Sequence, residues 1–246
     1  MVKVLSIGAH NDEIMADMGG TAYLLHKAGC DQIFLNLACQ WNSDSLSDEE
    51  KAEYMRQEEK SAEILGGKFI TLGNRNDLLF LESKQIIEET AKFIVDYNPN
   101  IVFIHWPRDN HLEHRETAQV SYKALAVAAV RGAKFKEVYA FDTGINQSTD
   151  YFSPDFYVRV DECVDTVKES LSQYNQNSAQ GPWLCQSYEL KRTYRGRSIA
   201  GGAKAEAFKF IKFPNGSDDI LLKQLLGNKF LWHGNGMYPS FAEYFF

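Results

Sequence analysis

Short apolar runs alternate with helix-like segments along the first 145 residues, and this alternation restricts the fold more than any other feature. The first run, residues 2–7, stops at Gly8, as expected for a buried strand. Runs of the same kind occupy residues 33–38, 69–72, 101–104 and 137–141. Strands that alternate with helices form parallel sheets covered on both faces. We therefore predict an α/β fold, a Rossmann-like three-layer sandwich with a mostly parallel central sheet.

Helical segments separate these runs. Ser47 and Glu50 have the spacing of a capping box, which predicts a helix from there to about Leu65. Further helices are expected at residues 21–28, between Ile86 and Tyr97, at 115–130 and at 163–174. Beyond residue 145 we expect a strand at 156–160, a loop over the polar residues 176–203, and a short helix or strand at 203–210. No linker or repeat interrupts the chain, so we predict one domain, residues 1–246.

The overall composition excludes some classes of function. The net charge of −7 and the isoelectric point near 5.4 argue against a general nucleic-acid binder, which needs a basic face. No apolar run approaches the roughly 18 residues of a membrane span, and we see no signal peptide. The four cysteines are scattered, as in a protein whose thiols stay reduced. We therefore expect a cytoplasmic protein.

A cluster of metal-competent side chains, Gly8-Ala9-His10-Asn11-Asp12-Glu13, follows the first apolar run. Ligands bind at the carboxyl ends of strands in open α/β sheets, and zinc accepts imidazole together with carboxylate ligands. Adjacent carboxylates point in different directions, so one can bind a metal while the other accepts a proton. An ordinary polar turn is the simpler alternative. A dinucleotide-binding loop is disfavoured, because the required glycines are missing and carboxylates repel phosphate.

A second cluster, residues 105–114, follows the run at 101–104. His111 and His114 are three positions apart, so on a helical turn they share one side. Either histidine alone would be a surface residue. Together with the first cluster, they suggest that two segments converge on one ion.

The two clusters resemble the motifs of the LmbE-like (PIG-L) family of zinc-dependent N-acetyl-sugar deacetylases. The first family motif reads Ala-His-Pro-Asp-Asp, with Gly-Gly-Thr a few residues later; here it stands as Ala9-His10-Asn11-Asp12-Glu13 with Gly19-Gly20-Thr21. The second reads His, any residue, Asp, His, Arg, often with an Asp two residues before; here it stands as Asp109-Asn110-His111-Leu112-Glu113-His114-Arg115. Weaker similarities are residues 56–59 and Ala205-Glu206-Ala207-Phe208, so the resemblance spans about residues 2–210.

The resemblance implies a role for each motif residue. His10, Glu13 and His114 would hold Zn²⁺ or another divalent metal, and Asp12 would be the general base that activates the zinc-bound water. His111 would stabilise the oxyanion or protonate the leaving amine, oriented by Glu113. The weaker candidates for substrate contact are Arg56, Asp109 and Arg195, the last in the loop expected at 176–203. The implied substrate is a small N-acetylated sugar or conjugate that carries an N-acetylglucosamine-like group.

Three positions depart from the family pattern. Asn11 replaces the usual proline, while Glu13 and Glu113 each replace an aspartate. Each glutamate adds one methylene but keeps the charge and ligand type. We therefore predict a working site with altered geometry.

Other functions remain open at this stage. One alternative is a weak or inactive family member that binds a metal and a sugar. Another is a metal-dependent hydrolase that acts on a different amide or ester. The retention of Asp12 and His111 favours an enzyme, because a binding module needs neither.

The C-terminal segment, residues 217–246, is rich in aromatic residues. They are Phe230, Trp232, Tyr238, Phe241, Tyr244, Phe245 and Phe246. We expect this segment either to pack on the core or to form a subunit contact in a homo-oligomer, because aromatic residues are enriched at interfaces.

Overall fold

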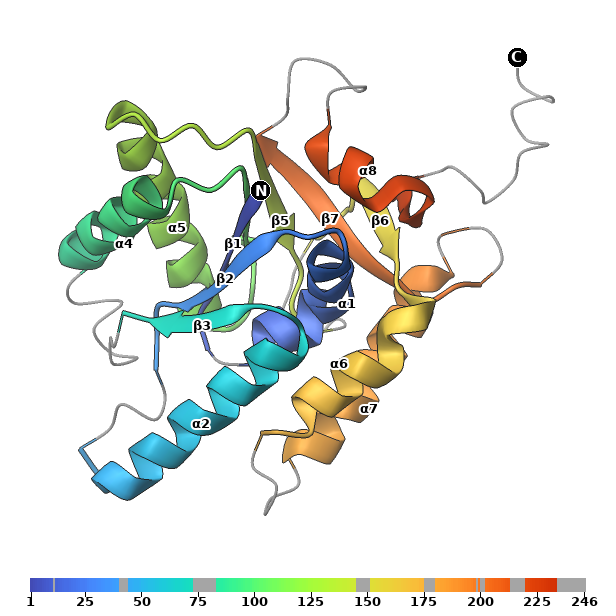
Figure 1. Ribbon diagram of the computed structural model, residues 1–246, viewed down its shortest axis with the longest axis horizontal. Helices are drawn as coiled ribbons and strands as arrows, with labels where there is room; N and C mark the ends of the chain where they lie inside the picture. The colour runs from blue at the N-terminus through green and yellow to red at the C-terminus, as the bar shows by residue number, and fades with distance from the viewer. Residues whose placement is uncertain are drawn as a thin grey trace.

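A single sheet of eight strands forms the centre of the part of the chain that the structure describes (Figure 1). The structure is a computed structural model that describes residues 1–10, 12–39, 44–72, 83–144, 151–174, 180–197, 199, 202–212 and 220–233. The strands are β1 (Lys3–Gly8), β2 (Asp31–Asn36), β3 (Lys68–Thr71), β4 (Ile101–His105), β5 (Glu137–Phe141), β6 (Phe156–Arg159), β7 (Ala205–Lys212) and β8 (Phe230–Trp232).

The strand order is β3-β2-β1-β4-β5-β7-β6-β8. The five strands from β3 to β5 are parallel to their neighbours. The remaining pairs, β5 with β7, β7 with β6 and β6 with β8, are antiparallel. The predicted α/β fold with a mostly parallel sheet is confirmed, and the antiparallel strands are those that follow residue 145.

Helices cover both faces of the sheet, which gives three layers (Figure 1). On one face lie α4 (Ser83–Tyr97) and α5 (Leu112–Val130); on the other lie α1 (Glu13–Lys27), α2 (Asp48–Ile64), α6 (Val164–Leu171), α7 (Gln180–Gly196) and the short α8 (Leu221–Leu226). Two short 3-10 turns, Asp161–Cys163 and Gly227–Lys229, precede α6 and β8. Side chains of β1 alternate between the two cores: Val4 packs in one, and Leu5 and Ile7 pack in the other.

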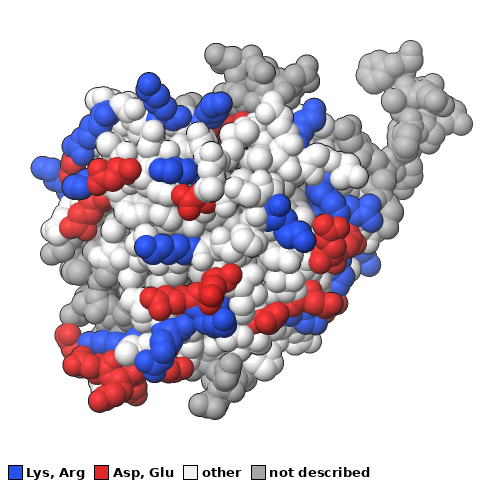
Figure 2. All heavy atoms as spheres, viewed as in Figure 1, with Lys and Arg blue, Asp and Glu red and all other residues white. Residues whose placement is uncertain are grey.

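The predicted capping box is present at the start of α2. The Ser47 hydroxyl accepts a hydrogen bond from the Glu50 backbone N–H at 3.2 Å, and the Glu50 carboxylate accepts one from the Ser47 N–H at 2.8 Å. The acidic first turn of this helix forms the red cluster at the lower left of Figure 2. Elsewhere on the face shown, acidic and basic side chains are interspersed.

Helix α1 is broken near its middle, and this explains an error in the sequence prediction. The helix expected at residues 21–28 covers only its second half, because the first half begins at Glu13. The backbone leaves the helical conformation at Met18, where φ is −142° and ψ is 17°. Just after the break, Gly20 lies so close to Val160 that a Cβ atom would be 2.7 Å from that side chain. The Gly-Gly sequence therefore permits close packing.

A buried ion pair replaces the helical hydrogen bonds that the break removes. The Glu206 carboxylate accepts hydrogen bonds from the N–H groups of Gly20 and Thr21, at 2.8 and 2.7 Å. Arg192 donates from Nε to Glu206 at 3.2 Å and from its terminal nitrogen to the carbonyl of Ala16. Both charged side chains are fully buried. One residue of α7 and one of β7 thus hold the two halves of α1.

The loop expected at residues 176–203 was wrong, because most of this segment is helix α7. Pro182 lies in the first turn, where no backbone N–H is needed for helical bonding. The face of α7 that packs against the protein includes two charged residues, so it lacks an apolar pattern. Its buried side chains are those of Leu184, Tyr188, Lys191 and Arg192. The segment 203–210, expected to be helix or strand, lies mainly in strand β7.

The described part of the C-terminal segment packs on the core. The Phe230 ring stacks on Phe156, with 4.4 Å between ring centroids. Residues 234–246, which include the other predicted aromatic contacts, lie outside the described residues. The homo-oligomer and the single domain stay predictions. Among the described helices, none is long and apolar enough to cross a membrane.

We expect the substitution Glu206→Gln to destabilise the protein by about 3–5 kcal/mol, the cost of leaving one charge of a buried pair unpaired. The new amide also places N–H groups where Arg192 and two backbone N–H groups already donate. Urea denaturation measures the effect. The matched control is Glu53→Gln, which removes an exposed pair with Arg56 on α2 and should leave the urea midpoint unchanged. Equal midpoints for both variants would contradict the role of the buried pair.

Candidate metal and active site

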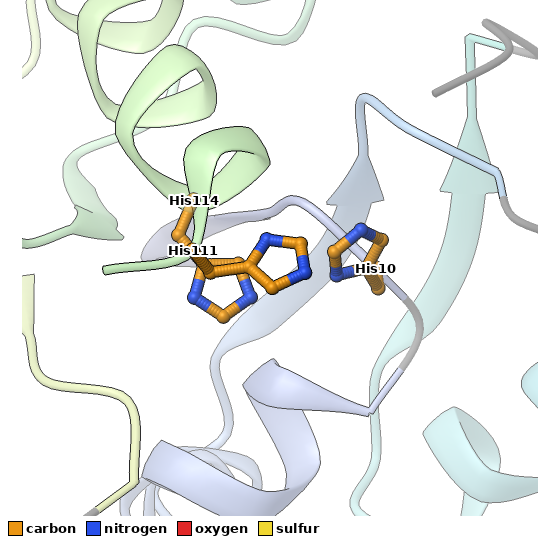
Figure 3. Close-up of side chains that lie close together, drawn as sticks. All are labelled: His10, His111 and His114. Atoms are coloured by element: carbon orange, nitrogen blue, oxygen red, sulfur yellow. The ribbon is translucent and has the colours of Figure 1, made fainter. Parts of the chain in front are cut away.

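The two polar clusters meet at the carboxyl ends of the neighbouring strands β1 and β4 (Figure 3). His10 follows β1, His111 precedes the first residue of α5, and His114 lies in the first turn of that helix. In Figure 3 the three rings lie close together between the end of β1 and the start of α5. Among the described residues, each of these histidines offers a ligand nitrogen, and these atoms lie within 4.8 Å of one another.

Glu13 joins two of these histidines. Its Oε1 atom lies 2.7 Å from Nδ1 of His10 and 3.0 Å from Nε2 of His114. Its Oε2 atom accepts a hydrogen bond of 2.6 Å from the His10 backbone N–H, which fixes the carboxylate at the start of α1. The site therefore offers two overlapping sets of metal ligands: the three histidines, or His10, Glu13 and His114.

Two further carboxylates contact the ring nitrogens of His10 and His114 that Glu13 does not contact. Nε2 of His10 lies 2.7 Å from Glu113, and Nδ1 of His114 lies 3.1 Å from Asp109. Carboxylates in this outer position orient metal-binding histidines and raise their basicity. Glu113 lies much closer to His10 than to His111, whose Nδ1 is 4.0 Å away. The expected orientation of His111 by Glu113 is therefore not the main contact that this carboxylate makes.

Asp109 is buried behind His114. Besides that ring, it accepts hydrogen bonds from the backbone N–H of His111, at 2.8 Å, and from the Thr143 hydroxyl. Its contacts therefore position the second cluster, whereas substrate contact was the role considered for it from the sequence.

The electrostatics of the site favour positive charge. Burial alone would lower the pKa of His10, but Glu13 and Glu113 outweigh it and raise that pKa to about 10. Burial is likewise outweighed at His114, where Glu13 and Asp109 raise the pKa to about 10. Burial would raise the pKa of Glu13, yet the two histidines hold it well below its usual value. The carboxylates around the rings thus form a site suited to a cation.

Asp12 borders the open space beside these residues. Burial and the adjacent Glu13 carboxylate raise its pKa to about 7. A carboxylate with such a pKa can accept a proton near neutral pH. His111 is the most exposed ring of the site, and partial burial together with the nearby His114 and His10 lowers its pKa.

His105, the last residue of β4, is a site residue to which the sequence analysis gave no role. Its Nε2 accepts a hydrogen bond from the Ala9 N–H at 3.0 Å, and its ring stacks on His114 with 4.9 Å between centroids. Burial lowers its pKa to about 4, so the ring is neutral. The available signal was its position as the first residue of the second cluster, directly after the apolar run at 101–104.

A cavity of about 240 Å³ lies beside the histidines. It is lined by the two clusters, the first half of α1, the residues after β5, and α7, a segment that was expected from the sequence to be loop. The lining residues are His10, Asp12, Glu13, Ala16, Asp17, His111, His114, Thr143, Gly144, Trp183, Leu184, Ser187, Tyr188 and Lys191.

Two arginines considered for substrate contact are not among the described residues that line this cavity. Arg56 is exposed on α2 and pairs with Glu53 at 2.5 Å. Arg195 lies in the last turn of α7, not in a loop, and pairs with Asp142 at 2.5 Å. Its contacts help to hold α7 in place.

Comparison with known proteins places the site in a family. Residues 5–125, which contain both clusters, match the model of the family described as PIG-L, GlcNAc-PI de-N-acetylase. The chain is 23% identical to a diacetylchitobiose deacetylase of Thermococcus kodakarensis over 222 residues, which cover 85% of this chain and 83% of that protein.

Solved structures share the fold. An N,N'-diacetylchitobiose deacetylase from Pyrococcus horikoshii, in complex with an inhibitor, matches with a TM-score of 0.67 and 21% identity over 88% of each chain. A 4-carboxy-2-hydroxymuconate hydratase from Pseudomonas putida matches with a TM-score of 0.68 and 18% identity, over 88% of this chain and 98% of that one. The chain therefore contains a PIG-L family domain over residues 5–125, and it shares its fold with both of these enzymes.

Proposed function

We propose that this protein is a metal-dependent deacetylase that hydrolyses the acetamide of an N-acetylglucosamine-like sugar. The observation that carries the proposal is the arrangement of His10, Glu13 and His114 around one point, with the Asp12 carboxylate beside them at the cavity. The family match over these residues and the similarity to a diacetylchitobiose deacetylase support the choice of an acetylated sugar.

The residues suit a divalent metal. Two imidazoles and one carboxylate form a ligand set that zinc accepts in catalytic sites, where a further position stays open. The carboxylates behind the two rings supply the orienting contacts that such ligands require. A metal held there would lower the pKa of a water molecule and polarise the substrate carbonyl. We assign Zn²⁺, with another divalent metal as the alternative.

We assign separate roles in the reaction to Asp12 and His111. Asp12 accepts the proton of the attacking water, for which its raised pKa is appropriate. His111, exposed at the cavity, donates a hydrogen bond to the oxyanion that forms when water adds to the carbonyl carbon. Breakage of the C–N bond, with transfer of the proton from Asp12 to the amine nitrogen, releases acetate and the free amino sugar.

A different substrate for the same apparatus is the second candidate. Glu13 and Glu113 stand where the family has aspartates, and the fold is shared with a hydratase. Fold alone does not determine chemistry. Acetate release from acetylated sugars, compared with release from other acetamides, distinguishes the candidates.

The substitution Asp12→Asn should keep the bound metal and lower kcat by about 100-fold or more, because the amide cannot accept a proton. Acetate release from N,N'-diacetylchitobiose gives the rate, and elemental analysis gives the metal content. The control Asp48→Asn changes an exposed carboxylate on α2 and should retain full activity. Normal turnover by the Asp12 variant would remove this residue from the role of base.

The two possible sets of metal ligands predict different metal contents for variants of Glu13 and His111. If His10, Glu13 and His114 hold the metal, Glu13→Gln and His114→Ala lose it, because each removes one of three ligands. His111→Ala should then keep about one equivalent of metal and lose activity. Elemental analysis after dialysis measures this. Loss of metal by the His111 variant, with full metal in the Glu13 variant, would instead assign the site to the three histidines.

Removal of the metal should abolish hydrolysis reversibly. Treatment with a chelator is expected to stop acetate release, and added Zn²⁺ should restore it, because the carbonyl loses its polarising cation. The same treatment should leave far-ultraviolet circular dichroism unchanged, since the core lies on both faces of the sheet away from the site. Full activity of a verified metal-free protein would contradict the proposal.

A further inference from the structure

The residues that α7 contributes to the cavity wall lie on one face of this helix. These residues, Trp183, Leu184, Ser187, Tyr188 and Lys191, recur at helical spacing. From Trp183 to Lys191 the helix rises about 12 Å. This part of the wall contains no residue of the two motifs, and the catalytic roles proposed above do not use it.

The chemical character of this wall changes along the helix. Lys191 is buried and contacts Asp17, which also lines the cavity, at 2.7 Å. Ser187 adds a hydroxyl in the middle of the wall. Trp183, at the other end, is a large apolar side chain that remains 57% exposed. The wall therefore combines an accessible aromatic ring with polar groups.

Such a combination is complementary to a pyranose ring. A sugar ring presents apolar C–H groups on its faces and hydroxyl groups at its edges. Aromatic side chains pack against the C–H groups, and hydroxyl or ionised side chains form hydrogen bonds with the sugar hydroxyl groups. A cavity of about 240 Å³ is somewhat smaller than typical ligand sites, which suits a single ring more than a polymer.

The exposure of Trp183 is not explained by packing. Leu184 and Tyr188, on the same face of α7, are buried in the hydrophobic core, whereas Trp183 is not part of any core cluster of the described residues. Leu190 is also exposed on α7, but it does not line the cavity. Leu190 therefore serves as a control for Trp183: both are exposed apolar side chains on α7, but only Trp183 lies at the cavity.

We propose that Trp183 is a specificity-determining residue that packs against the sugar ring of the substrate while the acetamide lies at the histidines. This inference rests on the proposed function. It predicts that Trp183 contributes to the binding of cyclic substrates and contributes nothing to the hydrolysis of acetamides that lack a ring.

The test compares Trp183→Ala, Trp183→Phe and Leu190→Ala in the metal-loaded protein. With N,N'-diacetylchitobiose, Trp183→Ala should raise KM about tenfold with little change in kcat, while Trp183→Phe keeps most of the affinity. With the acyclic N-acetylethanolamine, all variants should match the unmodified protein. Leu190→Ala should match it with both substrates. Circular dichroism verifies that each variant is folded.

The outcomes separate this inference from the proposed function. Equal KM for the sugar in Trp183→Ala and the unmodified protein overturns the role of Trp183 and leaves the deacetylase intact. An equal loss with both substrates also overturns it, since the effect is then on the catalytic site. If no acetamide is hydrolysed, the proposed function fails. Calorimetric titration with the disaccharide then decides the role of Trp183: weaker binding by Trp183→Ala supports it, and unchanged or absent binding overturns it.

Discussion

The arrangement of the cavity depends on the buried ion pair between Arg192 and Glu206. Buried charges are costly unless their hydrogen-bonding groups are paired. The Glu206 carboxylate accepts hydrogen bonds from two backbone N–H groups that directly follow the break in α1. The Arg192 guanidinium donates a hydrogen bond to a backbone carbonyl that precedes the break. Because the pair also joins α7 to β7, it fixes α7 over the broken helix. The ionisable groups before the break and the residues of α7 therefore line the same cavity.

The longer acids at positions 13 and 113 account for much of the electrostatics of the site. Glu13 contacts both His10 and His114 through one oxygen, and Glu113 reaches across from α5 to the far nitrogen of His10. Both carboxylates act on the same ring, so the site concentrates negative charge around a narrow space. The glutamates at these positions, where the resembling motifs have aspartate, thus make direct contacts between the two clusters.

Local patterns in the sequence were sufficient for the five parallel strands, the capping box and the meeting of the two clusters. Each of these features depends on residues that are close together in the sequence, or on the rule that the carboxyl ends of adjacent parallel strands lie at the same edge of the sheet. Helix α7 was missed because its buried face includes Lys191 and Arg192, whose partners Asp17 and Glu206 lie 174 and 14 residues away. The break at Met18 was missed for the same reason, since a distant carboxylate stabilises it. Arg195 was consequently placed in a loop, although it belongs to the end of this helix.

Under the proposed function and the role proposed for Trp183, reactivity and substrate selectivity come from separate stretches of this chain. The residues to which we assign the hydrolysis all lie within residues 5–125, whereas α7 lines the same cavity with residues between 183 and 191. On α7, the adjacent Lys191 and Arg192 anchor the helix, and Trp183 and Ser187 take no part in those buried ion pairs. If Trp183 contacts the substrate as proposed, substitutions at these two positions change which molecules bind without disturbing either the helix anchors or the groups to which we assign the hydrolysis. A protein built in this way can acquire a new substrate range through one surface while its chemistry is conserved on the other.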